Sequence, residues 1–274
     1  DELPDEFIEK IRTAVKRVGP EKFLLGEVWE DATTKYGFNQ RRTYLLGKGL
    51  DSVMNYPFKN AVLDFVKGKP AEQAANEILT ICEHYPAPAI DTALNFLSTH
   101  DTERALTVIA DEPANGRGRQ WQSGRCVTGD AYEEGLLRLR MAYAIIYTLP
   151  GVPCLYYGDE IAMQGYRDPF NRAFFRWDAH EQRLRPVLAQ LAQLRHTCEA
   201  FRTGQLRVLR AEDGILHYQR VGKMETAEII VNRTEHIIVE TLASGKSTEV
   251  NPMGFTIVVE EVGHNPNHSY YDYV

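Results

Sequence analysis

The sequence predicts an α/β fold in the larger first part of the chain and a small antiparallel β domain after it. Four short apolar segments each end in polar residues and are each followed by a helical pattern, which is typical of parallel strands alternating with outer helices. Beyond Gly204 the pattern changes to short alternating segments separated by turn residues. We therefore predict domains at residues 1–203 and 204–263, followed by an irregular tail at 264–274.

The four predicted strands should bring their carboxyl ends to one edge of the sheet. They cover residues 23–29, 47–58, 93–97 and 152–157. Connections between neighbouring parallel strands are right-handed, so the residues that follow each strand gather on a common face. The polar side chains expected there are those of Glu27, Asn55, Asp101 and Glu160.

Helical patterns separate these strands. Residues 2–18 have apolar side chains at helical spacing and stop at Gly19-Pro20. A second helical pattern, 61–85, is expected to break near residues 68–70, where Pro70 cannot continue a helix. The remaining long helices are predicted at 130–148 and 184–201.

The β domain is predicted from alternation of apolar and polar residues. Its strands are expected at 206–209, 215–220, 227–231, 236–241 and 256–262. A unit of about 60 residues buries little surface, so it usually needs a neighbour for stability. We therefore expect this domain to need a packing partner.

Four segments follow one another along the chain: GEVW at 26–29, VMNYPF at 53–58, STHDTER at 98–104 and PGVPCLYYGDE at 150–160. In this order they resemble successive signature segments of the alpha-amylase family of glycoside hydrolases. The VMNYPF segment, with Asp168-Pro169 and Arg172 ahead of Trp177, looks most like the branch of neopullulanases, cyclomaltodextrinases and maltogenic amylases.

The resemblance implies a fold. That family forms an eight-stranded barrel, and this chain resembles the second half of a (β/α)8 TIM barrel, strands 5–8, followed by a small antiparallel β-sandwich domain. A complete barrel takes about 250 residues, yet only four strand–helix units precede the β domain here. The resemblance therefore implies that the nucleophilic aspartate of the family lies upstream of residue 1, and that this chain is a fragment.

The resemblance also implies roles for two residues of the first strand. Glu27 would be the general acid and base, and Trp29 would line the leaving-group side of the sugar site, because a flat apolar ring matches the apolar face of glucose. From the residues alone, Glu27 could instead solvate a strand end or cap a helix. Trp29 could instead pack under the following loop.

Four further residues are expected to bind the sugar. By resemblance, Asp101 is the third essential carboxylate and binds hydroxyls of the cleaved sugar, and His100 donates to the same sugar. Asp168 and Arg172 would bind the sugar one unit beyond the cleaved bond. The alternatives are a helix cap for Asp101 and a loop-internal ion pair for Asp168 and Arg172. Arg104 is interpreted as a supporting ion-pair residue.

Composition excludes several classes of partner. The net charge of -7 and the pI near 5.7 provide no basic surface for nucleic acid, and no apolar run is long enough to span a membrane. The four cysteines lie far apart, without the spacing of a zinc or redox site, and this reduced-looking usage predicts a cytoplasmic location. We assign no metal and no cofactor.

Two functional hypotheses follow. In the first, the chain is part of a retaining α-glucan hydrolase that cleaves α-1,4, or also α-1,6, glucosidic bonds. The substrate is an α-glucan or a maltooligosaccharide. The chain by itself is then inactive, because it needs the missing amino-terminal barrel half. Acetal cleavage needs one carboxyl group as acid and another as nucleophile. The second is a catalytically incompetent half-barrel module that binds glucan or assembles with itself into a homo-oligomer, because open sheet edges attract partners.

Overall fold

The computed structural model describes residues 2–262 and 269–273. Four parallel strands lie side by side in chain order: β1 pairs with β4, the residue after β4 bridges to β5, and β5 pairs with β6. Their bounds are β1 (Leu25–Gly26), β4 (Ser52–Val53), β5 (Leu94–Asn95) and β6 (Val152–Pro153). All four are shorter than the sequence predicts, because ladder pairing extends over two residues in each. Their carboxyl ends share one side.

The predicted strand at 47–58 is wrong beyond residue 54. Helix α2 (Tyr56–Lys67) begins there, and the Asn55 side chain caps it by accepting from the Phe58 N–H at 3.2 Å. Pro57 lies in the first turn, where its missing N–H costs no hydrogen bond. Asn55 also donates to Asn95 at 3.0 Å, so the cap is tied to the neighbouring strand.

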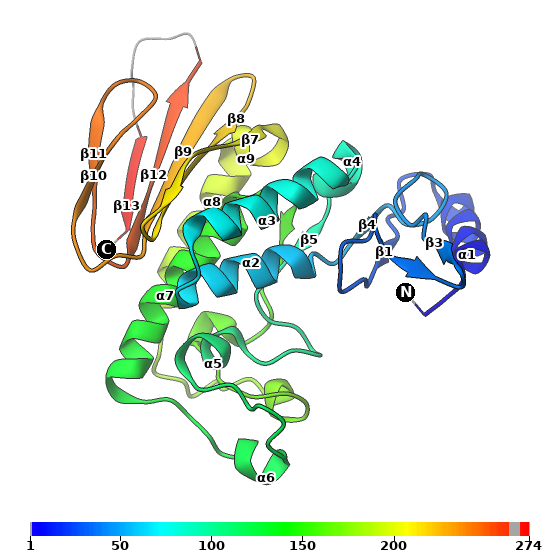
Figure 1. Ribbon diagram of the computed structural model, residues 1–274, viewed down its shortest axis with the longest axis horizontal. Helices are drawn as coiled ribbons and strands as arrows, with labels where there is room; N and C mark the ends of the chain where they lie inside the picture. The colour runs from blue at the N-terminus through cyan, green and yellow to red at the C-terminus, as the bar shows by residue number, and fades with distance from the viewer. Residues whose placement is uncertain (1, 263–268, 274) are drawn as a thin grey trace.

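The other long helices are α1 (Asp5–Val18), α3 (Ala71–His84), α7 (Gly129–Thr148) and α8 (Leu184–Thr197). Helices α3, α7 and α8 lie towards the β domain, whereas α1 lies beyond β1 and β4, at the end of the molecule opposite to that domain (Figure 1). The predicted break between α2 and α3 is confirmed, because Gly68 ends α2 with φ 130 and Pro70 precedes α3.

Short elements complete this part of the chain. They are the hairpin strands β2 (Tyr36–Gly37) and β3 (Gln40–Arg41), the helices α4 (Ala87–Ile90), α5 (Ala105–Ala110), α6 (Arg119–Gln122) and α9 (Ala200–Thr203), and the 3₁₀ turns η1 (Asp159–Ile161) and η2 (Phe170–Arg172). The predicted helix at 184–201 is therefore divided into α8 and α9.

A half-buried carboxylate fixes α1 to the start of β1. Asp51 accepts hydrogen bonds from Arg12 at 2.8 Å, from Lys16 at 2.9 Å and from the Leu24 N–H at 2.7 Å. Burial alone would raise the pKa of Asp51, but the hydrogen bonds from Lys16, Leu24 and Arg12 outweigh it and hold the pKa below its ordinary value of 3.8.

We expect Asp51→Asn to destabilise the protein by about 1–3 kcal/mol at pH 7 and by less in acid. A folded-state pKa that is lower than the unfolded one stabilises the fold above the unfolded value, and this stabilisation is lost as the pH falls through the folded value. Urea unfolding at pH 7 and at about pH 3 measures the difference. An equal loss of stability at both pH values would show that the ionised Asp51 carboxylate is not the source of the stabilisation.

The β domain is one five-stranded antiparallel sheet with a hairpin on its face. The sheet order is β13-β12-β9-β8-β7, and β10 pairs with β11. The bounds are β7 (Gln205–Glu212), β8 (Ile215–Val221), β9 (Glu225–Asn232), β10 (Ile238–Thr241), β11 (Ser247–Val250), β12 (Gly254–Glu261) and β13 (Ser269–Tyr273). Buried side chains such as Ile230, Leu242 and Val250 fill the space between hairpin and sheet.

The irregular tail predicted at 264–274 is wrong in part. Residues 269–273 form β13, which pairs antiparallel with β12 from Phe255 to Val259. An unpaired edge of β12 would leave its backbone groups without hydrogen bonds, and β13 supplies them. Residues 263–268 and 274 lie outside the described residues. β11 was also not predicted from the sequence.

The β domain packs on the helices through a polar junction inside a shared apolar core. Arg220, fully buried on β8, donates to the Thr148 carbonyl at 2.7 Å and to the Gly204 carbonyl at 2.8 Å. The hydroxyl groups of Tyr218 and Thr148 lie 2.5 Å apart. Side chains of α3, α7 and the sheet belong to one apolar cluster, as expected for a domain of this size.

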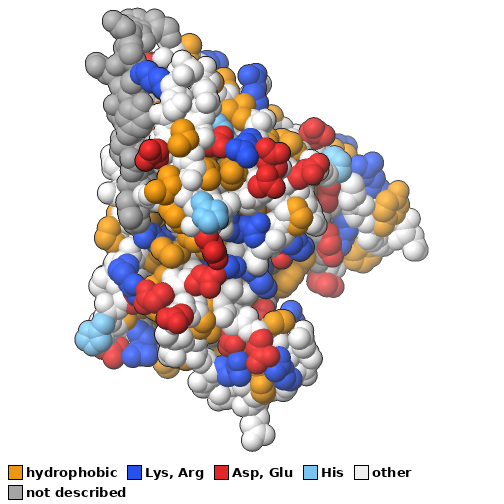
Figure 2. All heavy atoms as spheres, turned by 60° about the vertical axis from the view of Figure 1, so that its left-hand side comes forward, with side chains coloured by type: hydrophobic (Ala, Val, Ile, Leu, Met, Phe, Trp, Pro, Cys, Tyr) orange, Lys and Arg blue, Asp and Glu red, His pale blue; other side chains and the backbone are white. Residues whose placement is uncertain are grey.

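Charges of both signs are mixed over the face that Figure 2 shows, without a continuous basic field. This distribution agrees with the acidic composition. Within the described ranges, none of the helices has the length and apolar content that crossing a bilayer requires.

Candidate active site

Three predicted site residues converge although they come from different strands. Glu27 follows β1, and His100 and Asp101 lie in the turn that follows β5. One carboxylate or imidazole atom of each lies within 4.8 Å of the others. Glu27 is half-buried, whereas His100 and Asp101 are exposed. The structure therefore places a carboxyl pair and an imidazole at one accessible point.

Tyr56 is the contact of Glu27 that sequence reasoning missed. Its ring is buried, and its hydroxyl donates to Glu27 Oε1 at 2.7 Å. Burial first and the Glu27 hydrogen bond second raise the pKa of Tyr56, so it remains a donor at neutral pH. Its position at the first turn of α2, directly after the Asn55 cap, was the available signal.

Trp29 is not packed under a loop. Its ring stacks on Tyr56 with centroids 4.2 Å apart and an interplanar angle of 13°, and the side chain remains 42% exposed. An exposed indole beside a carboxylic acid is a suitable platform for the apolar face of a sugar. The alternative of a buried packing role is thereby set aside.

Asp101 is held by ion pairs rather than by a helix. It lies 3.2 Å from His100 Nε2 and 2.8 Å from Arg172 Nη2. The next helix, α5, begins only at Ala105, so the cap interpretation of Asp101 is wrong. Arg172 also pairs with Asp168 at 3.1 Å, which makes the predicted loop-internal ion pair real. All of these side chains stay exposed to a ligand.

Asn171 is a second residue that sequence reasoning missed. It is fully buried on η2, and its amide nitrogen donates to the carbonyl oxygens of Thr99 at 3.3 Å, His100 at 2.7 Å and Thr102 at 2.9 Å. The neighbouring Arg172 donates from Nε to the same His100 carbonyl at 2.8 Å. Together they fix the backbone that carries His100 and Asp101.

We expect Asn171→Asp to lower kcat/KM by up to about 100-fold in any form of the protein that is active, because a small misplacement of a positioned group has that effect. The new carboxylate would place an acceptor against three carbonyl acceptors. Steady-state kinetics measure the change, and exposed Asn115, changed to aspartate, is the control. Unchanged kinetics would show that this amide does not position the turn.

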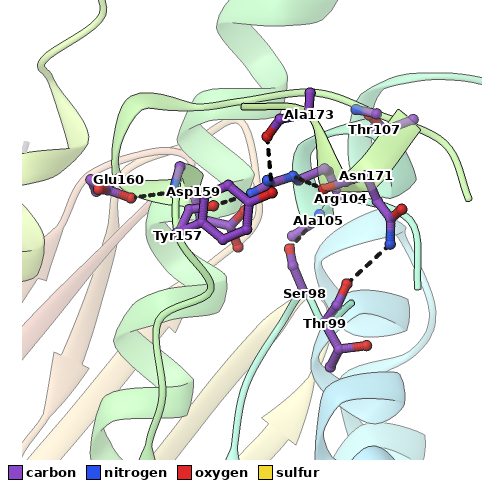
Figure 3. Close-up of polar contacts among 12 residues, drawn as sticks. Ser98, Thr99, Arg104, Ala105, Thr107, Tyr157, Asp159, Glu160, Asn171 and Ala173 are labelled. Atoms are coloured by element: carbon purple, nitrogen blue, oxygen red, sulfur yellow. Dashed lines mark hydrogen bonds and ion pairs between the residues drawn. The ribbon is translucent and has the colours of Figure 1, made fainter. Parts of the chain in front are cut away.

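A buried ion pair lies next to Asn171 (Figure 3). Arg104 and Asp159 lie 3.1 Å apart with side chains 0% and 2% exposed. Arg104 also donates to the carbonyl oxygens of Tyr157 and, at 3.0 Å, Asn171. Burial raises the pKa of Asp159 above its ordinary value, although hydrogen bonds from Ser98, Tyr143 and Arg104 act to lower it. The interpretation of Arg104 as a supporting residue agrees with these contacts.

The chemistry of this site suits hydroxyl groups more than a metal ion. Glu27, His100 and Asp101 are close enough to share a cation, but the Arg172 guanidinium already lies on Asp101 and would repel one. Carboxylates accept from sugar hydroxyls, and imidazole and guanidinium groups donate to them.

Comparison with known proteins supports this interpretation. The sequence profile described as "Alpha amylase, catalytic domain" matches residues 3–203. The chain belongs to the alpha-amylase family. It is 32% identical over 240 residues to a cyclomaltodextrinase of Geobacillus thermopakistaniensis, covering 85% of this chain and 35% of that protein. It is 30% identical over 236 residues to an amylopullulanase of Thermoanaerobacter thermohydrosulfuricus, covering 80% of this chain and 15% of the relative.

Solved structures share the fold. The ligand-free cyclic alpha-maltosyl-(1-->6)-maltose hydrolase of Arthrobacter globiformis superposes with a TM-score of 0.78 over 95% of this chain and 54% of its own, at 24% identity. A cyclomaltodextrinase superposes with a TM-score of 0.72 over 88% of this chain and 37% of its own, at 29% identity. The chain thus spans about a third of the cyclomaltodextrinases that it matches.

Proposed function

We propose that this chain is part of a retaining α-glucan hydrolase that cleaves α-1,4, or also α-1,6, glucosidic bonds. The observation that carries the proposal is the convergence of Glu27 with His100 and Asp101 at the carboxyl ends of two parallel strands, β1 and β5, which lie on either side of β4. The relatives are glycoside hydrolases named for α-glucan substrates. A structural neighbour has been solved in complex with maltose.

In this proposal Glu27 gives its proton to the glycosidic oxygen as the bond breaks. The departing sugar leaves as an alcohol, and the anomeric carbon passes to a carboxylate nucleophile about 5–5.5 Å from Glu27. Glu27, now ionised, then takes a proton from the attacking water. The Tyr56 hydroxyl orients the Glu27 carboxyl group through its hydrogen bond to Oε1.

The other residues bind the substrate. Asp101 would accept from hydroxyls of the sugar that is cleaved, and such bonds strengthen as charge develops at the ring. His100 would donate to the same sugar. Arg172 and Asp168 would hold the next unit, with Arg172 exchanging part of its ion pairing for sugar hydroxyls.

We assign the nucleophile to a complementary half-barrel that precedes this chain in sequence. Apolar side chains remain exposed along the outer strands of the parallel sheet, including Phe23, Leu25 and Val152. β1 and β6 form the two ends of the strand order, so each can pair with a further strand. The second candidate function, a self-associating glucan-binding module without catalysis, uses these same edges.

The test compares this chain with a version extended upstream by the complementary half, here called the extended protein. Both are assayed on maltotriose and cyclomaltodextrin, and light scattering reports their mass. Hydrolysis by the extended protein alone supports the proposal. Hydrolysis by the short chain would show that residues 1–274 supply the nucleophile. Binding without hydrolysis in both, together with dimers of the short chain, would favour the module.

A further inference from the structure

The segment that joins α5 to α7, residues 111–128, closes on itself although α6 is its one helical turn. It lies at the lower tip of the molecule in Figure 1. The guanidinium groups of Arg117 and Arg125 lie over the Trp121 ring, 3.7 Å and 4.1 Å from its centroid, where the ring attracts both cations. Arg125 also pairs with Asp111 at 2.7 Å, so the start and the end of the segment are joined. We call residues 111–128 the bracing segment.

The bracing segment is tied to residues 164–166 of the loop that follows β6. The Gln164 side chain accepts from the Val127 N–H at 2.7 Å and donates to the Val127 carbonyl at 3.0 Å, so it satisfies both backbone groups of that residue. The buried Tyr166 donates from its hydroxyl to the Glu112 carbonyl at 2.5 Å. Its ring also packs edge-on against Trp121, with centroids 5.2 Å apart.

Residues 164–166 in turn determine the position of the next few residues. The Gly165 N–H donates to Thr107 Oγ1 at 2.8 Å, and its carbonyl accepts from the Arg104 N–H at 2.9 Å. A Cβ atom at Gly165 would lie 2.3 Å from the Phe170 carbonyl oxygen, so the backbone at 165 and at 170 is in close contact. The loop between them therefore closes on a base that is fixed from two sides, and Asp168 lies within it.

The charged side chains of this loop have no comparable support of their own. Asp168 and Arg172 are both exposed and lie 3.1 Å apart, and Arg172 lies 2.8 Å from the exposed Asp101. Exposed ion pairs hold long side chains in place only weakly, because water competes for them. The backbone that carries Asp168 and Arg172 must therefore fix where these groups meet a ligand.

We propose that Gln164 is a positioning residue, through which the bracing segment fixes Asp168 and Arg172 and so sets the affinity for the sugar unit beyond the cleaved one. The inference rests on the proposed function, because it assumes that these two residues hold that unit. A substrate that lacks the unit does not depend on the bracing segment. The preference for maltosyl over glucosyl substrates is then determined by residues that do not touch the sugar.

The experiment uses the extended protein and two substrates that differ by one glucose unit, α-glucosyl fluoride and α-maltosyl fluoride. Gln164→Glu keeps an acceptor for the Val127 N–H but places a carboxylate oxygen against the Val127 carbonyl. We expect KM for α-maltosyl fluoride to rise about tenfold while kcat stays unchanged, because the lost interaction binds ground state and transition state alike. Both constants for α-glucosyl fluoride should stay unchanged. A fluoride electrode measures the rates.

Two further variants separate the lost hydrogen bond from other effects. Tyr166→Phe removes a different hydrogen bond between the same two segments, and it should raise KM for α-maltosyl fluoride with the same selectivity. Gln120→Glu makes the same chemical change as Gln164→Glu at an exposed position of α6. It should change neither substrate. An equal effect of Gln120→Glu would assign the result to the added charge and overturn the inference.

The remaining outcomes distinguish this inference from the proposed function. An unchanged KM for α-maltosyl fluoride in Gln164→Glu overturns the positioning role and leaves the proposed function standing. An equal loss on both fluorides also overturns the positioning role, because it indicates general damage to the fold. Failure of the extended protein without these substitutions to release fluoride from either substrate overturns the proposed function itself. Unaltered hydrolysis of α-glucosyl fluoride shows that a variant is folded.

Discussion

Replacement of Glu27 by glutamine is expected to lower kcat of the extended protein on maltotriose by about 10²–10⁴-fold, the contribution of a positioned general acid. Glutamine keeps the shape of the side chain and can still accept from the Tyr56 hydroxyl, but it cannot deliver a proton. KM should change little, because the lost interaction acts in the transition state. Steady-state kinetics on maltotriose measure both constants.

A substrate with a better leaving group separates the acid role from a structural one. α-Maltosyl fluoride releases fluoride without needing a full proton, so formation of the covalent intermediate should survive Glu27→Gln far better than with maltotriose. Glu30→Gln is the matched control, since Glu30 lies three residues away and pairs with Lys35 on the surface. Equal losses on both substrates would argue that Glu27 only supports the site.

Removal of the buried charge at Asp159 is the second large effect that we expect. Asp159→Asn should lower the free energy of unfolding by about 3–5 kcal/mol, because it leaves Arg104 buried without its counter-charge. The Tyr143 hydroxyl, which donates to Asp159 Oδ2 at 2.6 Å, also loses its charged acceptor. Urea unfolding at pH 7 measures the loss.

Two further variants test the cause. Asp178→Asn removes the carboxylate of an exposed pair with Arg176 and should leave stability unchanged within error. Changing both Arg104→Met and Asp159→Leu removes both charges, and it should recover part of the stability lost in Asp159→Asn, because apolar residues of similar volume often replace a buried pair without loss. If the double variant is less stable than Asp159→Asn, the pair itself, and not the uncompensated charge, provides the stability.

Local sequence patterns were sufficient to predict the order of the four parallel strands and of the long helices. Apolar segments that end in polar residues located the parallel strands, and Gly68 with Pro70 located the break between α2 and α3. These features depend on a few neighbouring residues, whose backbone preferences act within one turn or one strand. The lengths of the parallel strands were overestimated, since only pairing with a neighbour decides how far a strand extends.

For the candidate site, the sequence predicted which residues belong to it, but it did not predict the contacts that hold them in place. Through their resemblance to the alpha-amylase family, the motifs predicted Glu27, His100 and Asp101 as site residues, and the handedness of the crossovers predicted that the strand ends carrying Glu27 and Asp101 share one side. That Tyr56 donates to Glu27, 29 positions away, was decided only by tertiary structure. The bonds from Asn171 to the Thr99–Thr102 turn span about 70 positions. Such contacts depend on the packing of whole elements, which no local pattern encodes.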